Sequence, residues 1–417
     1  MTAPQLLAYI CSAIAFQLLV GGAIAFWRYR RQPSRPGISA PVATQVAGTN
    51  AWTGLRDFRV THRAYEDAAQ TQCSFYLAPI DGRPLDAFKP GQFLTLALQL
   101  PGDPTAAMAT AGTGATITRC YSLSDAPSPQ TYRITVKRVP APAGRQDLPA
   151  GLGSNYLHEH IQTGDLIRLR APAGHFHIDA DGDMPAVLVA GGIGITPMMS
   201  MLRWCLAAQP GRRVHLYYGV RNSTEQAFKA LLEALAAAHP TFTLQVVYSR
   251  PHATDQLGRD YQHVGHVDID LLRRSLPHGR HQFYLCGPGT MMKSLVPALR
   301  DWGVQDGDLH HEAFGPASVQ PATPAVGSAG LAAPAVVRLE RSGRTLDWSG
   351  QDGNLLDFAE RHGQMVESGC RAGSCGACQT RLISGSVAYA ERPDHDIAPG
   401  HCLLCVGRPA SDIVLEL

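Results

Sequence analysis

The sequence lacks an excess of charge of either sign. Its 417 residues include 36 Lys and Arg against 34 Asp and Glu, which leaves a formal net charge of +2. Because nucleic-acid-binding proteins carry clustered basic charge, this composition gives no support for nucleic-acid binding. The chain is too long for one ordinary hydrophobic core, so we expect two to four domains.

Cysteines are scarce outside one short region. The chain has 10 of them, and half lie between Cys370 and Cys405, while the others are scattered along the chain. A secreted disulfide framework distributes its cysteines differently. The clustering indicates a cofactor site in a reducing compartment.

One apolar run stands near the start of the chain, at residues 6–27, and it has no basic residue before it. As a helix it would span about 33 Å, enough for a hydrocarbon core of roughly 30 Å. Arg28, Arg30 and Arg31 follow it, so the positive-inside rule places the rest of the chain in the cytoplasm. We expect a single-pass anchor in the inner membrane of a bacterium. A cleaved signal peptide is the alternative, but its charges would precede the apolar run.

The cysteine-rich region has the spacing of an iron–sulfur site. Cys370, Cys375 and Cys378 are spaced C-x₄-C-x₂-C, and Cys402 and Cys405 follow. This is the plant-type arrangement for a 2Fe–2S cluster. Glycines at positions 373 and 376 permit unusual φ angles and close approach of amides to the sulfurs. A zinc site or a disulfide pair is the alternative, although zinc usually prefers paired C-x₂-C or Cys/His spacing.

Residues 51–180 predict a small antiparallel β-barrel, because short alternating runs are split by Gly and Pro. One of these runs contains Arg119-Cys-Tyr121-Ser122. Alternation along a strand places Arg119 and Tyr121 on one face and Ser122 on the other. Further on, Gly151-Leu-Gly153-Ser154 indicates a turn that opens a helix, where N–H groups and the helix dipole can hold a pyrophosphate.

Residues 181–316 change to strand–helix alternation, which predicts a doubly wound α/β domain with a parallel sheet. A Gly-rich turn follows the first strand and precedes an apolar helix, so its amides can approach a pyrophosphate. The residues of this turn are Gly191, Gly192, Gly194, Thr196 and Pro197. Two later segments are Cys286-Gly287-Pro288 at a strand end and Glu312-Ala-Phe314. Cys286 could also be an ordinary small buried residue.

Two segments predict flexible tethers, residues 28–50 and the Ala/Pro-rich residues 317–334. Residues 335–417 then show strand patterns, a helix, the cysteine loop and a final strand. Together with the apolar run at residues 6–27, these features predict a multidomain chain with an anchor and three folded parts.

The motifs R-x-Y-S, G-G-x-G-x-T-P and C-G-P, in this order, resemble the ferredoxin–NADP reductase superfamily. The barrel and α/β parts are similar to the reductase half of flavohaemoglobins. The resemblance implies that Arg119 pairs with a flavin phosphate, Tyr121 stacks on the isoalloxazine ring and Ser122 hydrogen-bonds near its N5 atom. It also implies that Cys286 lies beside the nicotinamide ring, with Glu312 and Phe314 shaping the pocket for hydride transfer.

The C-terminal part resembles the α+β fold of plant-type ferredoxins, the β-grasp. In that family the fourth ligand precedes an Arg-Pro pair, and Leu404-Cys405-Val-Gly-Arg-Pro matches this pattern. The resemblance therefore implies Cys370, Cys375, Cys378 and Cys405 as cluster ligands, with Cys402 as an extra thiol.

The implied function is transfer of electrons from NADH through FAD and a 2Fe–2S cluster to an acceptor protein. FAD is expected over FMN because the turn at residues 151–154 suits a diphosphate. NADH is expected over NADPH by analogy with relatives that carry a ferredoxin domain, although Arg221 and Arg250 could meet a 2′-phosphate. The anchor favours a membrane-associated oxygenase or hydroxylase as acceptor. A quinone reductase and a redox-sensing or electron-carrying module are the alternatives.

Overall fold

The computed structural model describes residues 52, 54–85, 87–100, 116–141, 150–314, 334–350, 352–364, 366, 368–369, 371, 373, 376–390, 393, 395 and 397–417. The predicted anchor at residues 6–27 lies outside these ranges. Among the described residues, none of the helices combines the length and the apolar character needed to cross a bilayer.

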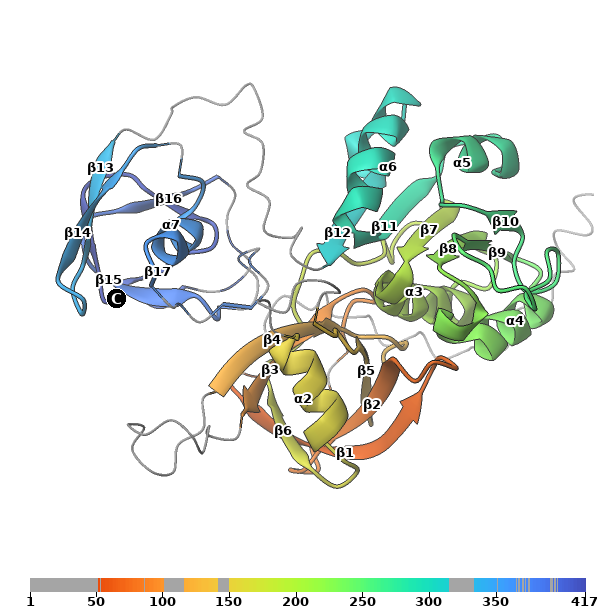
Figure 1. The fold of residues 1–417 in the computed structure, drawn as a ribbon, viewed down its shortest axis with the longest axis horizontal. Helices are drawn as coiled ribbons and strands as arrows, with labels where there is room; N and C mark the ends of the chain where they lie inside the picture. Colours follow the sequence, from red (N-terminus) through yellow and green to blue (C-terminus); the bar gives the residue numbers. More distant parts are fainter. Residues whose placement is uncertain are drawn as a thin grey trace, which may run out of the picture. The chain divides into compact units, whose positions relative to one another are not determined.

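The first folded part is a six-stranded antiparallel sheet with the order β4-β3-β6-β1-β2-β5, which Figure 1 shows around helix α2. An isolated antiparallel bridge between Leu123 and Ile134 links the two outer strands, so the sheet closes on itself. Alternate residues such as Phe58 and Val60 point into a buried core, and Leu157 of α2 joins that core. The elements are β1 (Arg56–Tyr65), β2 (Gln72–Pro79), β3 (Phe93–Gln99), β4 (Thr116–Ser122), β5 (Tyr132–Lys137), α2 (Leu152–His160) and β6 (Leu166–Leu169).

The second part is a six-stranded sheet with the order β10-β9-β8-β7-β11-β12, and its neighbouring strands are all parallel. The strands are β7 (Ala186–Gly191), β8 (Val214–Val220), β9 (Phe242–Tyr248), β10 (His263–Val264), β11 (Gln282–Pro288) and β12 (Leu309–Phe314). The sequence patterns did not predict the two outer strands. β10 has only two residues, and β12 contains the polar run His310-His311-Glu312, which has no continuous apolar character.

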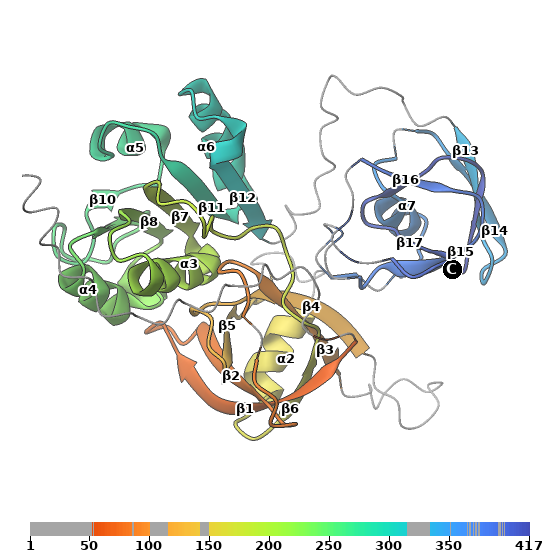
Figure 2. The ribbon, with the colours of Figure 1, turned by 180° about the vertical axis from the view of Figure 1, so that it is seen from behind.

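Helices cover both faces of this parallel sheet. Figures 1 and 2 show α3 and α4 on one side and α5 and α6 on the other. In β7 the alternation is direct, because Leu188 packs in the core under α3 while Val187 and Val189 pack in the core under α5 and α6. The helices are α3 (Ile195–Ala208), α4 (Lys229–Ala238), α5 (Ile269–Ser275) and α6 (Gly289–Asp301), with 3₁₀ turns η1 (Gly192–Gly194), η2 (Ser223–Glu225) and η3 (Asp306–Asp308).

The chain leaves β7 toward β8 on one side, whereas β11 pairs with β7 on the other side. The carboxyl ends of β7 and β11 therefore form the switch point of the sheet, where ligands bind in open α/β folds. This topology brings the Gly-rich turn and the Cys286 segment to one edge.

The third part is a mixed five-stranded sheet with the order β14-β13-β19-β15-β17, beside a two-stranded sheet of β16 and β18. Strands β13 and β19 pair in parallel, and Trp348 packs in one core with Phe358 of α7. Asn354 caps α7 by accepting a hydrogen bond from the Asp357 amide at 2.8 Å. The elements are β13 (Ala335–Leu339), β14 (Arg344–Trp348), α7 (Leu355–Arg361), β15 (Gln379–Ser384), β16 (Val387–Tyr389), β17 (His401–Leu403), β18 (Gly407–Pro409) and β19 (Ile413–Leu415).

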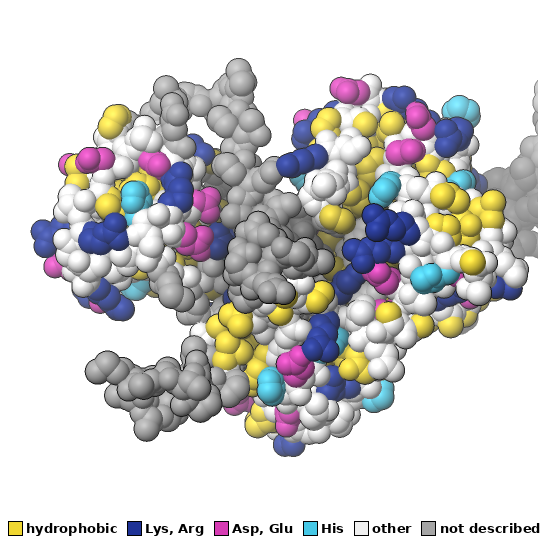
Figure 3. Space-filling model, viewed as in Figure 1, with side chains coloured by type: hydrophobic (Ala, Val, Ile, Leu, Met, Phe, Trp, Pro, Cys, Tyr) yellow, Lys and Arg dark blue, Asp and Glu magenta, His cyan; other side chains and the backbone are white. Residues whose placement is uncertain are grey.

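The surface agrees with the balanced composition. On the face in Figure 3, acidic and basic side chains are interspersed over the described parts. The three folded parts confirm the expected multidomain architecture, and each has its own buried core.

Candidate functional site

The R-x-Y-S strand and the glycine turn meet in the barrel, although strand β5 lies between them in the sequence. A Cβ atom on Gly153 would lie 2.8 Å from Cγ of Arg119 and 3.2 Å from the hydroxyl oxygen of Tyr121. Only glycine therefore lets these side chains lie against the first turn of α2. The Arg119 guanidinium donates a hydrogen bond to the carbonyl oxygen of Thr118 at 2.7 Å, and burial raises the pKa of Tyr121.

The N-terminus of α2 is suited to an anion. Gly151 occupies the cap position, and among the described residues no side chain caps this helix. Ser154 instead donates from its hydroxyl to the carbonyl oxygen of Gly151 at 3.2 Å, which tightens the turn. Uncapped amides, the helix dipole and the neighbouring Arg119 guanidinium together fit a flavin diphosphate. Ser122 lies at the end of β4, is 5% exposed and is in register with Phe93 of β3.

The dinucleotide turn packs directly against the Cys286 segment. A Cβ atom on Gly194 would lie 2.5 Å from the carbonyl carbon of Cys286 and 2.9 Å from the amide nitrogen of Gly287. A Cβ atom on Gly191 would lie 2.7 Å from Cδ of Pro288. The two segments thus form one cradle at the switch point, and its size depends on glycine at these positions.

Three further residues complete the turn. Gly192 has a φ of +55°, a left-handed conformation that favours glycine. Thr196 donates from its hydroxyl to the carbonyl oxygen of Ile193 at 3.0 Å, and Pro197 stands in the first turn of α3, where a missing N–H costs nothing. The turn η1 leads directly into α3, and the Ile195 amide donates to carbonyl oxygens of η1. Among the described residues, the uncapped start of this helical segment is therefore η1 itself, where backbone amides can meet a nicotinamide dinucleotide pyrophosphate.

Cys286 and Glu312 are neighbours across two parallel strands, because Cys286 of β11 is in register with Glu312 of β12. Cys286 is fully buried, and burial, with the nearby Glu312 charge, raises the pKa of its thiol. A neutral thiol at physiological pH is a poor nucleophile, so the chemistry expected here is contact with a ring rather than covalent attack. Burial also raises the pKa of Glu312 to about 7. Phe314 ends β12 in register with Pro288.

Two of the four predicted cluster ligands, Cys378 and Cys405, are described, whereas Cys370 and Cys375 lie outside the described residues. The amide of Cys405 donates to Sγ of Cys378 at 3.4 Å. Hydrogen bonds from Cys405 and from the Leu404 amide lower the pKa of Cys378 to about 7. A sulfur held in this way is prepared to be a thiolate ligand.

Cys402 has a different environment. It lies in β17 in register with Thr380 and, like Cys378 and Cys405, is buried in the core of the third part, so the difference lies in its titration. Burial, together with Cys378, raises the pKa of its thiol to about 12. This favours the neutral thiol and suits a core residue better than a ligand.

The glycines of the cysteine loop adopt the expected backbone, since Gly373 has a φ of +77° and Gly376 one of +70°. A Cβ atom on Gly376 would also clash with the His395 ring. Arg371 holds the loop against α7, because its guanidinium lies 3.0 Å from a Glu360 oxygen and 3.4 Å from an Asp357 oxygen. The sequence motifs did not point to Arg371 or His395.

Sequence reasoning also missed residues around the dinucleotide cradle and around the barrel cradle, the contact of Gly153 with Arg119 and Tyr121. Met291 of α6 packs against the dinucleotide turn, since a Cβ atom on Gly191 would lie 3.0 Å from its sulfur. Asp125, Ser200 and Arg203 connect the barrel to α3. None of these residues belongs to a recognisable motif. They are identified by contacts between segments that lie far apart in the sequence, and such contacts leave no local sequence pattern.

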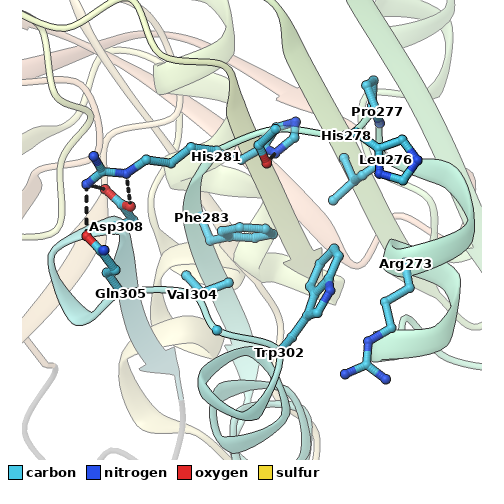
Figure 4. Close-up of a pocket in the computed structure, with 13 residues that line it drawn as sticks. Arg273, Leu276, Pro277, His278, His281, Phe283, Trp302, Val304, Gln305 and Asp308 are labelled. Atoms are coloured by element: carbon cyan, nitrogen blue, oxygen red, sulfur yellow. Dashed lines mark hydrogen bonds and ion pairs between the residues drawn. The ribbon is translucent and has the colours of Figure 1, made fainter.

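A surface cavity of about 630 Å³ lies elsewhere, between the end of α5, the start of β11 and the segment after α6 (Figure 4). Phe283 and Trp302 meet edge to face in its wall, and Arg280 forms an ion pair with Asp308. This cavity is at the amino end of β11, whereas the cradle is at the carboxyl end. It is therefore separate from the cofactor sites described above.

Two protein-family models match the chain. The oxidoreductase NAD-binding domain covers residues 188–296, and the 2Fe-2S iron-sulfur cluster binding domain covers residues 337–410. The first range contains the dinucleotide cradle, and the second contains the cysteine loop. These matches agree with the chemistry of the two sites.

Among known proteins, a flavohemoprotein of Halalkalibacterium halodurans is 38% identical over 275 residues, 66% of this chain and 63% of that protein. The chain thus spans less than two thirds of that relative. The FAD/NAD-binding domain of a nitric oxide dioxygenase from Vibrio cholerae is 32% identical with a TM-score of 0.52, covering 63% of this chain and 99% of the domain. Phthalate dioxygenase reductase is 27% identical with a TM-score of 0.50, covering 87% of this chain and 98% of that protein.

The fold and the sites define an oxidoreductase that uses FAD, a nicotinamide dinucleotide and a 2Fe–2S cluster. The chain belongs to the ferredoxin-reductase-like FAD/NAD-binding family, with an added 2Fe–2S domain as in phthalate dioxygenase reductase.

Replacing Gly194 by Ala tests the dinucleotide cradle. The added methyl group overlaps the Cys286 backbone, so we expect the free energy of unfolding to fall by about 1–3 kcal/mol and NADH affinity to fall with it. Gly211→Ala is the matched control, since a Cβ atom there meets nothing within 4 Å. Denaturant unfolding and NADH titration are the measurements, and equal behaviour of the two variants would contradict the close packing.

Replacing Cys405 or Cys402 by Ser tests the fourth ligand. We expect Cys405→Ser to lose the visible absorption and the EPR signal of the cluster, because a serine oxygen replaces a thiolate. Cys402→Ser should keep both signals, since burial raises the pKa of the Cys402 thiol and favours its neutral form. Loss of the cluster in Cys402→Ser alone would reverse the assignment.

The buried carboxyl of Glu312 predicts a pH-dependent stability. Because its pKa is raised from 4.5 to about 7, the folded state binds this proton more tightly than the unfolded state. Its contribution to stability therefore falls as pH rises from 4.5 through 7. Glu312→Gln, which resembles the protonated form, should gain in Tm over the natural protein across this range. A constant difference in Tm between pH 5 and 8, checked by calorimetry, would contradict the raised pKa.

Proposed function

We propose that this protein is a membrane-anchored, NADH-dependent reductase that passes electrons to an acceptor protein, a membrane-associated oxygenase or hydroxylase. The observation that carries the proposal is the presence, in one chain, of the Arg119–Gly153 cradle, the Gly194–Cys286 cradle and the Cys378–Cys405 pair. When bound, the flavin would supply the conversion of a two-electron hydride into single electrons, and a 2Fe–2S cluster would supply a one-electron carrier.

The chain's own residues divide the work. Arg119 and the α2 amides bind the flavin diphosphate, while Tyr121 and Ser122 orient the ring. Gly191, Gly194 and Gly287 let the dinucleotide approach the backbone, and Cys286 supplies a neutral surface beside the nicotinamide. Cys378 and Cys405, with Cys370 and Cys375, hold the cluster.

The carboxylate of Glu225 and its two ion pairs favour NADH over NADPH. Glu225 follows β8, where the adenosine ribose of a dinucleotide lies in α/β folds. Although burial works in the opposite direction, the charges of Lys137 and Arg221 lower the pKa of Glu225, so it is ionised. Its carboxylate lies 3.1 Å from the Arg221 guanidinium and 3.2 Å from the Lys137 ammonium. Both cations are therefore engaged, and a carboxylate repels a 2′-phosphate.

The membrane location rests on the sequence of residues 6–27 and on the arginines that follow. A tether in the membrane raises the effective concentration of the chain beside an acceptor in the same membrane. Membrane fractionation of the full chain, compared with a chain lacking residues 1–31, tests this location. Recovery of both proteins in the soluble fraction would contradict it.

Coenzyme choice is open to a direct test with Glu225→Gln. Removing this carboxylate frees Arg221 and Lys137 for a 2′-phosphate, so we expect the preference for NADH over NADPH in kcat/KM to fall by about tenfold, or ~1.4 kcal/mol. Glu233→Gln removes an exposed carboxylate of α4 and serves as the control. An unchanged preference in Glu225→Gln would remove this explanation.

The route of electrons is tested with Cys378→Ser in the full chain. This variant should keep NADH-driven reduction of ferricyanide, which the flavin can supply, and should lose reduction of a one-electron acceptor protein such as cytochrome c. Unchanged reduction of cytochrome c in a Cys378→Ser chain that has lost the cluster would place the cysteine outside the proposed route.

A further inference from the structure

The segment that follows the flavin strand is attached to the helix that follows the dinucleotide turn. β4 ends at Ser122, and Asp125 comes shortly after it. The Ser200 hydroxyl, fully buried in α3, donates to the backbone carbonyl oxygen of Asp125 at 2.8 Å. Nε of Arg203 lies 3.0 Å from one carboxylate oxygen of Asp125, and its Nη1 donates to the other at 3.2 Å. Helix α3 therefore contacts Asp125 at both its main-chain carbonyl and its side-chain carboxylate.

Arg133 holds the same segment from within the barrel. Its Nε donates to the Ser124 hydroxyl at 3.2 Å, a second nitrogen donates to the Ser124 carbonyl oxygen, and its Nη1 lies 3.5 Å from the Asp125 carboxylate. The guanidinium also lies over the Phe228 ring of the parallel-sheet domain, 5.0 Å from its centroid. Arg133 is only 5% exposed, and its buried positive charge is stabilised by the ion pair with Asp125.

These contacts link the two cofactor cradles by short, stiff connections. On the barrel side, Asp125 is a few residues beyond Tyr121 and Ser122. On the other side, Ser200 and Arg203 stand on α3, which begins at Ile195 directly after the Gly192–Gly194 turn. Because a helix is stiff along its axis, contacts that hold the second and third turns of α3 also hold η1 in place, and η1 is the turn that would bind the dinucleotide.

We propose that Asp125 is a positioning residue that sets the approach of the nicotinamide ring to the flavin ring. The proposal rests on the proposed transfer of a hydride from NADH to FAD. Transfer rates fall steeply when reacting atoms are misplaced by as little as 1 Å. Asp125 touches neither cofactor in this scheme and acts through α3 and through the strand of Arg119, Tyr121 and Ser122.

A second attachment joins the same two domains and provides a matched comparison. The Lys137 ammonium of β5 lies 3.2 Å from the Glu225 carboxylate, and the Ala69 amide donates to the Thr224 carbonyl oxygen at 2.9 Å. These contacts reach the segment after β8 and not α3. Lys137→Gln therefore weakens the domain interface without touching the helix behind the dinucleotide turn.

The test uses the full chain loaded with FAD, in the natural form and as Asp125→Ala, Arg203→Lys and Lys137→Gln. Stopped-flow absorbance gives the limiting rate of FAD reduction with NADH and with NADH deuterated at the transferred position. We expect Asp125→Ala to lower this rate by about 10- to 100-fold with a changed isotope effect, while the NADH dissociation constant changes much less. Arg203→Lys should be intermediate between Asp125→Ala and the natural protein.

Hydrogen exchange of the protein without NADH supplies a readout that does not depend on turnover. The amides of η1 and the first turns of α3 should exchange faster in Asp125→Ala and at the natural rate in Lys137→Gln. Unchanged exchange and an unchanged limiting rate in Asp125→Ala would overturn the proposal. A lower Tm or FAD content with the natural rate and isotope effect would also overturn it, since that is a purely structural role.

The outcomes separate this proposal from the proposed function. If the natural protein binds FAD but NADH does not reduce it, the proposed function fails, and the proposal fails with it whatever the exchange data show. If NADH reduces the natural protein and Asp125→Ala matches it in limiting rate, isotope effect and hydrogen exchange, only the positioning role fails. Should Asp125→Ala not fold, Arg203→Lys gives the same comparison with the carboxylate retained.

Discussion

The contact between two backbones at the carboxyl ends of β7 and β11 is the constraint on which the rest of the site depends. Gly194 lies so close to Cys286 and Gly287 that no side chain fits between them. This contact fixes the turn η1 against the edge of the sheet. The register of β11 with β12 then places Glu312 beside Cys286, so one close approach determines the position of three candidate residues.

The barrel uses the same physical device. Gly153 leaves room for Arg119 and Tyr121 at the start of α2, as Gly194 leaves room for Cys286 at the start of α3. In both places a helix begins without a side-chain cap among the described residues, next to a strand end.

Much of this arrangement could be predicted from sequence, because glycine motifs and cysteine spacing encode local chemistry. The structure brings Gly153 against Arg119 and Gly194 against Cys286, while their roles toward the cofactors stay predictions. The outer strands β10 and β12 were missed, since two residues or a polar run carry no periodic signal. Asp125 and Arg203 were missed for another reason, because an ion pair between domains leaves no pattern in either segment. Cys370, Cys375 and residues 6–27 lie outside the described residues, and their roles stay predictions.

The most direct measurement is an anaerobic titration of the full chain, loaded with FAD and cluster, with NADH. Absorbance follows the flavin, and low-temperature EPR follows the cluster. We expect the flavin absorbance to bleach and the signal of a reduced 2Fe–2S cluster to appear in the same titration. A flavin that bleaches while the cluster stays oxidised would contradict the route from the dinucleotide cradle through the barrel to Cys378 and Cys405.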